Sequence, residues 1–388
     1  MTKSKQLTRR TFVKKSAAGI AVIGGAAAGS SLLKSAPLFA ANKKKSGSAA
    51  VEYRTLGNTG LKMTTLGFGA MRTSNPAVIR RAIDKGVNNI DTARGYMGGQ
   101  NEEIVGRAIG DIRDDIIITT KIKVNGKSRM FSDMEASLRA LGSDYFDIVL
   151  IHAQSSLSDI NNEDAREFLT KVKEDGKARF IGFSTHRNMA NLLNAAAEDG
   201  FYDVVLTAYN FKHGEDMTSA VKNASKAGVG VIAMKTQAGG YESAKMGNLS
   251  PHQASLKWVL QNKSVANTIP SMVTYEQVDE NFQVMNENLG FLDKKTLYRY
   301  GDLIDKDLCR FCDECSGQCS MNVSVPDMNR CVMYADGYND LALGKTNYSE
   351  IPAAQTAAQC IDCDDCLVQC VNGIDVASKM KRAKELFA

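Results

Sequence analysis

Eight of the nine cysteines in this 388-residue chain fall into two runs with the same spacing, Cys-x2-Cys-x2-Cys-x3-Cys. No cysteine precedes Cys309, so the last part of the chain has its own chemistry. Disulfide frameworks rarely repeat so dense a spacing, whereas all-cysteine zinc sites also use Cys-x2-Cys pairs. Two full runs favour iron–sulfur clusters, with zinc as the second interpretation. The predicted ligands are Cys309, Cys312, Cys315, Cys319, Cys360, Cys363, Cys366 and Cys370.

Residues 309–376 resemble a dicluster ferredoxin of the bacterial type. The resemblance implies two [4Fe–4S] clusters, each held by three cysteines of one run and the fourth cysteine of the other run. Ser320 and Val371 stand where a proline usually follows the fourth cysteine. Cys331 is left over, and we predict a buried free thiol there. The implied sets are Cys309, Cys312, Cys315 and Cys370 for one cluster, and Cys360, Cys363, Cys366 and Cys319 for the other.

A second group of reactive side chains follows three apolar segments in the first half of the chain. Asp91, Lys121 and His152 stand at the ends of these segments, and Tyr96 follows Asp91 in the same predicted loop. A free tyrosine titrates near ~10, and a neighbouring lysine ammonium would lower that pKa. Asp91 would hold the lysine, and His152 could donate a hydrogen bond to a substrate carbonyl. Together the four residues predict a proton-transfer site.

These residues meet only if their strands end at the same edge of a sheet. Between residues 51 and 290, apolar runs of strand length alternate with segments of helical periodicity, such as 132–141, 164–174 and 189–198. Eight such strands predict an α/β fold, a (β/α)8 TIM barrel with catalytic residues at the carboxyl ends of its strands. A doubly wound sheet is disfavoured because no Gly-x-Gly-x-x-Gly follows the first strand. The predicted strands are 66–70, 89–92, 116–122, 148–152, 179–183, 204–207, 230–234 and 266–269.

The same region resembles the aldo-keto reductase family throughout. The resemblance implies that Asp91, Tyr96, Lys121 and His152 are the catalytic tetrad. Tyr96 would then act as general acid or base while a nicotinamide transfers hydride. The motifs that carry the resemblance include residues 53–60 (YRTLGNTG), 66–69 (LGFG), 90–93 (IDTA) and 176–184 (GKARFIGFS).

The cofactor positions of that family agree less well with this chain. The resemblance places adenine contacts at Glu280 and Asn281 and a further cofactor contact at Ser184. The positions that would bind a 2′-phosphate, the carboxamide and the nicotinamide ring carry other residue types. We therefore expect NADP(H) or NAD(H), tightly bound if present. The departures are at Ser271, Gln277, Leu206 and Met234.

The first 41 residues are typical of an export signal. Residues 8–14 (TRRTFVK) resemble the twin-arginine motif, and a mildly apolar stretch rich in alanine and glycine follows over 16–33. Such signals engage the Tat translocon, which exports proteins that are already folded and loaded with cofactor. The segment therefore predicts a periplasmic or otherwise exported protein with a tightly held cofactor. A linker over 42–50 would separate the signal from the barrel.

Composition excludes one class of partner. The chain carries 48 Lys and Arg against 43 Asp and Glu, a net charge of +5. Much of the basic excess lies in the first 45 residues, so the rest offers no argument for nucleic acid. With 44% apolar residues the chain can bury one large core or two moderate ones. We expect a barrel over 51–290 and a mainly helical, ferredoxin-like iron–sulfur domain over 291–388.

The combined prediction is an exported oxidoreductase that acts on a small-molecule carbonyl or alcohol by tyrosine-assisted hydride transfer. Its two clusters would exchange electrons with an unidentified redox partner. The alternative is a ferredoxin-like electron carrier whose barrel is a non-catalytic binding or docking domain. A third interpretation keeps the enzyme and makes the clusters structural.

Overall fold

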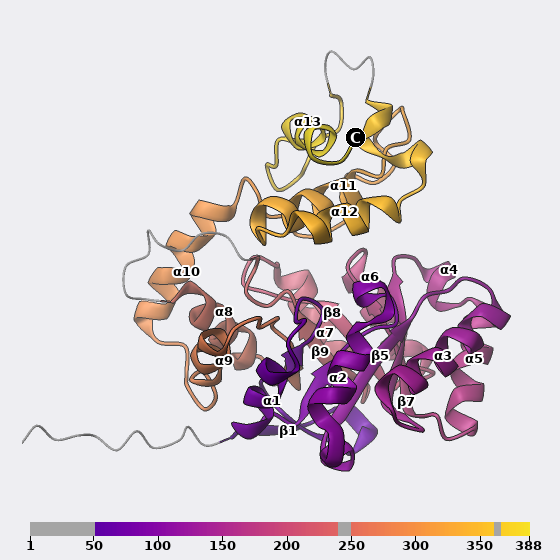
Figure 1. Cartoon of the computed structure of the whole chain (residues 1–388). Helices are drawn as coiled ribbons and strands as arrows, with labels where there is room; N and C mark the ends of the chain where they lie inside the picture. Colours follow the sequence, from indigo (N-terminus) through magenta and orange to yellow (C-terminus); the bar gives the residue numbers. More distant parts are fainter. Residues whose placement is uncertain (1–50, 240–249, 361–365) are drawn as a thin grey trace, which may run out of the picture. The chain divides into compact units, whose positions relative to one another are not determined.

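Figure 1 shows a computed structural model of the chain, which describes residues 51–239, 250–360 and 366–388. The predicted signal peptide (1–41), the linker (42–50) and Cys363 lie outside these residues. The described residues belong to one compact unit. In the described part of the chain, no helix is long and apolar enough to span a membrane.

Eight parallel strands form one sheet that closes on itself, as predicted. Each strand pairs with the next along the chain, and bridges from Leu66 to Thr268 and from Gly69 to Ser271 join the last strand to the first. Every residue of β5, β8 and β9 is buried, as expected for a parallel sheet covered on both faces. The strands are β3 (Phe68–Gly69), β4 (Asn89–Asp91), β5 (Ile117–Ile122), β6 (Phe146–Gln154), β7 (Ala178–Thr185), β8 (Val204–Ala208), β9 (Gly230–Met234) and β10 (Asn267–Thr268).

One helix or helix pair follows each strand and covers the outside of the barrel. In α5 the buried residues Ala165, Phe168, Leu169 and Val172 recur at helical spacing, and the Asn162 side chain caps its first turn. The three predicted helical segments correspond to α3, α5 and α6. The helices are α1 (Pro76–Asp84), α2 (Asn101–Ile109), α3 (Lys127–Leu141), α4 (Leu157–Ile160), α5 (Glu163–Glu174), α6 (Met189–Asp199), α7 (Glu215–Lys226), α8 (Pro251–Gln261) and α9 (Tyr275–Phe282).

A hairpin of β1 (Tyr53–Thr55) and β2 (Lys62–Thr64) covers the amino-terminal end of the barrel. Leu56, in its turn, is fully buried against Gly230, the first residue of β9. A Cβ atom on Gly230 would lie 2.5 Å from Leu56 Cγ, so the close packing requires glycine there. The hairpin closes this end and leaves the carboxyl ends of the strands, where the predicted catalytic residues lie, as the open end.

The C-terminal module, residues 291–388, is helical in its described part, as predicted. Its inner residues Leu308, Phe311, Met333 and Tyr334 belong to the same hydrophobic cluster as the barrel core. Its outer residues form a second, smaller core that includes Met328. The helices are α10 (Phe291–Ile304), α11 (Val325–Val332), the π-helical turn η5 (Met333–Gly337), α12 (Leu341–Ser349) and α13 (Val376–Phe387).

Candidate active site

Asp91, Lys121 and Tyr96 meet at the carboxyl ends of β4 and β5, as the sequence predicted. The ammonium of Lys121 donates to Asp91 Oδ1 (2.5 Å), to the Thr92 carbonyl (2.7 Å) and to Tyr96 Oη (3.3 Å). Lys121 and Asp91 are buried, whereas Tyr96 is partly exposed and lines a cavity. The three donors of the ammonium are therefore all used, which fixes the phenol hydroxyl next to a buried ion pair.

Burial controls the protonation of this group. Burial raises the pKa of Tyr96 well above its usual value, and the negative charge of Asp91 raises it further. We predicted that Lys121 would lower this pKa, and the net direction is the opposite because burial dominates. Burial also raises the pKa of Asp91 and lowers that of Lys121, each opposed by the other residue. At neutral pH Tyr96 is therefore protonated and able to donate a proton.

His152 lies next to Tyr96 at the end of β6. The two rings meet edge to face, with centroids 5.8 Å apart. Burial lowers the pKa of His152 well below its usual value, and the charges of Lys121, Lys123 and Arg330 lower it further. The imidazole is thus neutral at pH 7 and carries one N–H donor. All four predicted tetrad residues come together, and a neutral His152 suits the predicted role of hydrogen-bond donor to a substrate oxygen.

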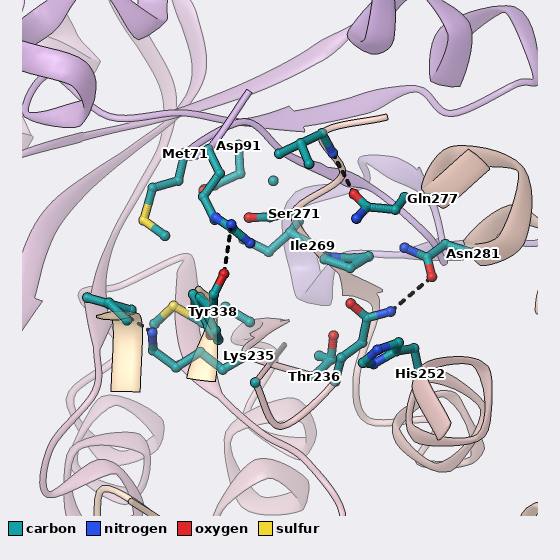
Figure 2. A pocket seen from close by; sticks show the side chains of 18 of the residues that line it. Met71, Asp91, Lys235, Thr236, His252, Ile269, Ser271, Gln277, Asn281 and Tyr338 are labelled. Atoms are coloured by element: carbon teal, nitrogen blue, oxygen red, sulfur yellow. Dashed lines mark hydrogen bonds between the residues drawn. The ribbon is translucent and has the colours of Figure 1, made fainter. Parts of the chain in front are cut away.

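The cavity in Figure 2 extends from the catalytic residues to the ends of β9 and β10. One half contains Asp91 and Tyr96. The other half is lined by residues that follow β9 and β10 in the barrel, where TIM barrels commonly bind phosphate groups. These residues are Thr236, Gln237, His252, Ile269, Pro270, Ser271, Gln277, Glu280 and Asn281.

The predicted cofactor contacts divide into two groups. Glu280 and Asn281 line the cavity, where Asn281 Oδ1 accepts a hydrogen bond of 2.9 Å from Gln237 and Glu280 accepts one from Ser250 (Figure 2 shows the first). Ser184 is fully buried, and its hydroxyl accepts from the Ala153 amide at 2.9 Å. Ser184 therefore supports the carboxyl end of β6 and is not among the residues that line the cavity.

Two buried polar atoms in the cofactor half have no hydrogen-bond partner within the described residues. They are Thr236 Oγ1 and His252 Nδ1. Buried polar atoms in proteins are nearly always paired, so these two fit a polar ligand in this half of the cavity.

Sequence reasoning missed several residues of the catalytic half. Lys235 and His186 follow barrel strands, whereas Tyr334 and Tyr338 come from the C-terminal module. No motif singles out the two tyrosines, because they lie between the cysteine runs in a segment recognisable only as helical. The catalytic cavity is therefore built by the barrel and the module together.

The module is attached to loops at the carboxyl ends of five barrel strands: β3, β5, β7, β8 and β9. These contacts surround the open end of the barrel. They pair Arg72 with Asp340 (3.2 Å), Lys123 with Glu350 (2.7 Å), Arg187 with Asp313 (2.8 Å), His213 with the Arg310 carbonyl (3.1 Å) and Lys235 with Tyr334 (2.9 Å).

The described cysteines of both runs lie in the C-terminal module, where Cys315, Cys319, Cys360, Cys366 and Cys370 pack beside the outer core. Burial, and then the charges of Cys315, Cys312 and Cys370, raise the pKa of Cys309 to about 12. Cys319, Cys360 and Cys366 line one cavity beside the outer core. Among the described residues, no three His, Cys, Asp or Glu side chains are already arranged to hold a metal ion. The cluster assignment stays a prediction, whereas Cys331 is buried as expected.

Known proteins resemble the barrel part of the chain. Residues 65–248 match the sequence profile of the Aldo/keto reductase family. Over 157 residues the chain is 32% identical to the aldo-keto reductase YhdN of Bacillus subtilis, which covers 34% of this chain and 47% of that protein. Over 297 residues it is 28% identical to the L-galactose dehydrogenase of Arabidopsis thaliana, covering 64% and 92% respectively.

A solved structure has the same fold. The aldo-keto reductase of Klebsiella pneumoniae in complex with NADPH superposes with a TM-score of 0.54 at 24% identity, covering 65% of this chain and 95% of that one. The profile match, the relatives and the assembled tetrad agree with one another. Over residues 65–248 the barrel of this chain is similar to the aldo/keto reductase family, and the chain is an oxidoreductase of that type.

Proposed function

We propose that this protein is an exported, NADP(H)- or NAD(H)-dependent carbonyl reductase that exchanges electrons with a redox partner through two [4Fe–4S] clusters. The observation that carries the proposal is the hydrogen-bonded group of Tyr96, Lys121 and Asp91, facing a cavity that continues past β9 and β10. A small aldehyde or ketone is the substrate class that this proton donor serves.

Tyr96 supplies the proton in this reaction. Because burial keeps the phenol protonated, Tyr96 donates its proton to the carbonyl oxygen as that oxygen gains negative charge. Lys121 and Asp91 hold the phenol in place, and neutral His152 orients the carbonyl oxygen by a hydrogen bond. A bound nicotinamide would supply hydride to the carbonyl carbon, while Tyr96 supplies the proton to the carbonyl oxygen, so that the product is an alcohol.

The cofactor half of the cavity supports a dinucleotide. The similar protein from Klebsiella pneumoniae is described in complex with NADPH. In this chain, Thr236, His252, Ser271 and Asn281 would line the path of the cofactor. Because the module is tied around the open end of the barrel, a bound dinucleotide would exchange slowly, as a protein exported with its cofactor requires.

The cysteine runs of the module support the cluster part of the proposal. Cys309 lies close enough to Cys312, Cys315 and Cys370 for their charges to act on its thiol. Cys319, Cys360 and Cys366 line one cavity, and Cys363 belongs to the same run in the sequence as Cys360 and Cys366. Each [4Fe–4S] cluster exchanges one electron, so the pair can hold the two electrons of one hydride equivalent.

Anaerobic purification of the exported protein tests the proposal. Iron is counted, and every small molecule released on denaturation is identified by mass spectrometry. We expect about eight irons per chain and a stoichiometric nicotinamide cofactor. Iron without an organic cofactor, combined with no reduction of methylglyoxal when NADPH is added, would instead support an electron carrier with a docking barrel.

A further inference from the structure

Lys235 stands directly after β9, in the catalytic half of the cavity. Its ammonium donates a hydrogen bond of 2.9 Å to Tyr334 Oη. Three aromatic rings of the C-terminal module surround the ammonium, at centroid distances of 4.7 Å for Tyr334, 5.5 Å for Phe311 and 5.8 Å for Tyr338. The module therefore fixes where this positive charge sits.

The charge of Lys235 has no anionic partner within the described residues. Other cations at the open end of the barrel are paired, as Lys121 is with Asp91 and Arg72 with Asp340. Burial lowers the pKa of Lys235, but Tyr334 and Tyr338 outweigh burial and leave that pKa above its usual value. A partly buried, charged ammonium without a counter-ion favours an anion from outside.

The ammonium belongs to the substrate side of the cavity. In Figure 2 the Lys235 side chain extends away from His252, Gln277 and Asn281, which line the cofactor half. Tyr334, its hydrogen-bond partner, lines the same cavity as Tyr96. An anion bound by Lys235 would thus lie near the proton donor.

His186 supplies a second polar group beside this position. Its Nδ1 is buried without a hydrogen-bond partner among the described residues, and the side chain lines the same cavity. Burial, and then the charges of Lys235 and Arg330, lower the pKa of His186 well below its usual value, so the ring is neutral. A neutral imidazole and an ammonium together match the two oxygens of a carboxylate.

We propose that Lys235 binds a carboxylate of the substrate, so that the enzyme prefers aldehydes and ketones that carry a carboxylate group. The inference rests on the proposed carbonyl reduction and names the substrate class of the same site. It gives the module a direct role, because Tyr334, Phe311 and Tyr338 position the ammonium. Lys235 could instead bind the pyrophosphate of the cofactor, and the experiment below distinguishes this anion from a substrate carboxylate.

A matched pair of substrates tests the inference. 4-Carboxybenzaldehyde and methyl 4-formylbenzoate differ in one charge, and the ratio of their kcat/KM values measures carboxylate preference. We expect the wild-type holoenzyme to prefer the acid at least about tenfold, and Lys235→Met to lower that ratio about 10- to 100-fold. Lys235→Arg should keep most of the preference because it keeps the cation. Lys263→Met, at an exposed lysine, is the control and should leave both rates unchanged.

Binding without turnover separates this inference from the proposed function. Calorimetry with 4-(hydroxymethyl)benzoate and its methyl ester should show tighter binding of the acid, lost in Lys235→Met. If the acid binds in this way but neither aldehyde is reduced, the carboxylate site stands and the proposed reduction fails. Equal preference in the wild type and Lys235→Met, or a loss confined to NADPH binding, would overturn the carboxylate site.

Discussion

The barrel and the C-terminal module hold their reactive residues in different ways. In the barrel, Asp91 and Lys121 are the last and next-to-last residues of neighbouring strands, so the sheet register alone brings them together. In the module, the predicted cluster ligands lie mostly in loops between short helices. Regular strands can position catalytic groups by themselves, whereas loop cysteines are held in place chiefly by the group that they bind.

The two regions also share one boundary. The inner face of the module packs with the barrel core through Phe311, Met333 and Tyr334, while its outer face has a core of its own. Tyr334 is thus at once part of the module, part of the barrel core and part of the cavity wall. The module therefore completes the active site of the barrel.

Removing the phenol hydroxyl of the barrel site should have the largest effect. In Tyr96→Phe the buried ion pair remains but the proton donor is lost, so kcat for aldehyde reduction should fall about 10²- to 10⁴-fold. Steady-state rates with methylglyoxal and NADPH measure this change. Tyr298→Phe, at an exposed tyrosine, is the matched control and should keep the wild-type rate. A Tyr96→Phe rate within a few-fold of wild type would assign the proton to another group.

Removing one module cysteine should affect metal content and leave the barrel folded. Cys315→Ser should lose one predicted cluster, so the iron content should fall from about eight to about four per chain. The matched control is Cys331→Ser, because Cys331 is a buried thiol outside both predicted ligand sets. Iron is measured on anaerobically purified protein, and equal iron in both variants would contradict the ligand assignment.

Much of the barrel could be predicted from the sequence because its signals are local. Each strand is an apolar run that the fold buries, and all eight predicted strands are present with small shifts at their ends. The four tetrad residues could be predicted because they lie at, or shortly after, the ends of predicted strands. The protonation state of Tyr96 could not be predicted, because its pKa depends on burial and on the nearby charge of Asp91, which no local pattern encodes.

The contribution of the module to the cavity could not be predicted, for a different reason. Tyr334 and Tyr338 meet Lys235 across about 100 residues of chain, and their own segment carries only ordinary helical periodicity. Lys235 itself follows Met234, which departs from the family pattern, and precedes Thr236, which belongs to no motif. Contacts of this kind arise from the docking of two regions, which the sequence of either region does not show.

The protein should lose stability in acid because of His213, which lies where the two regions meet. His213 accepts a hydrogen bond from the Asn210 amide and donates to the Arg310 carbonyl of the module. Burial lowers the pKa of His213 to about 4, below the unfolded value of about 6.5. Protonation therefore favours unfolding, so this residue should cost about 2–3 kcal/mol of stability as the pH falls from about 6.5 to about 4. Urea unfolding at a series of pH values measures the free energy of unfolding. In His213→Gln this free energy should fall less steeply over the same pH range, and an unchanged pH dependence would exclude His213 as the cause.

The smallest effect should come from a single ion pair between the regions. Arg187, after β7, contacts Asp313 and Asp327 of the module, and all three side chains are partly buried. Arg187→Met should cost about 1–2 kcal/mol, because two carboxylates lose their partner while the aliphatic packing is kept. Arg80→Met breaks an exposed pair on the barrel surface and should change stability by less than about 0.5 kcal/mol.

Differential scanning calorimetry compares the stability of the two variants. Because Arg187 attaches the module, its loss should also speed the exchange of bound cofactor. If Arg187→Met and Arg80→Met change Tm and cofactor exchange equally, the module is held by its apolar contacts with the barrel core.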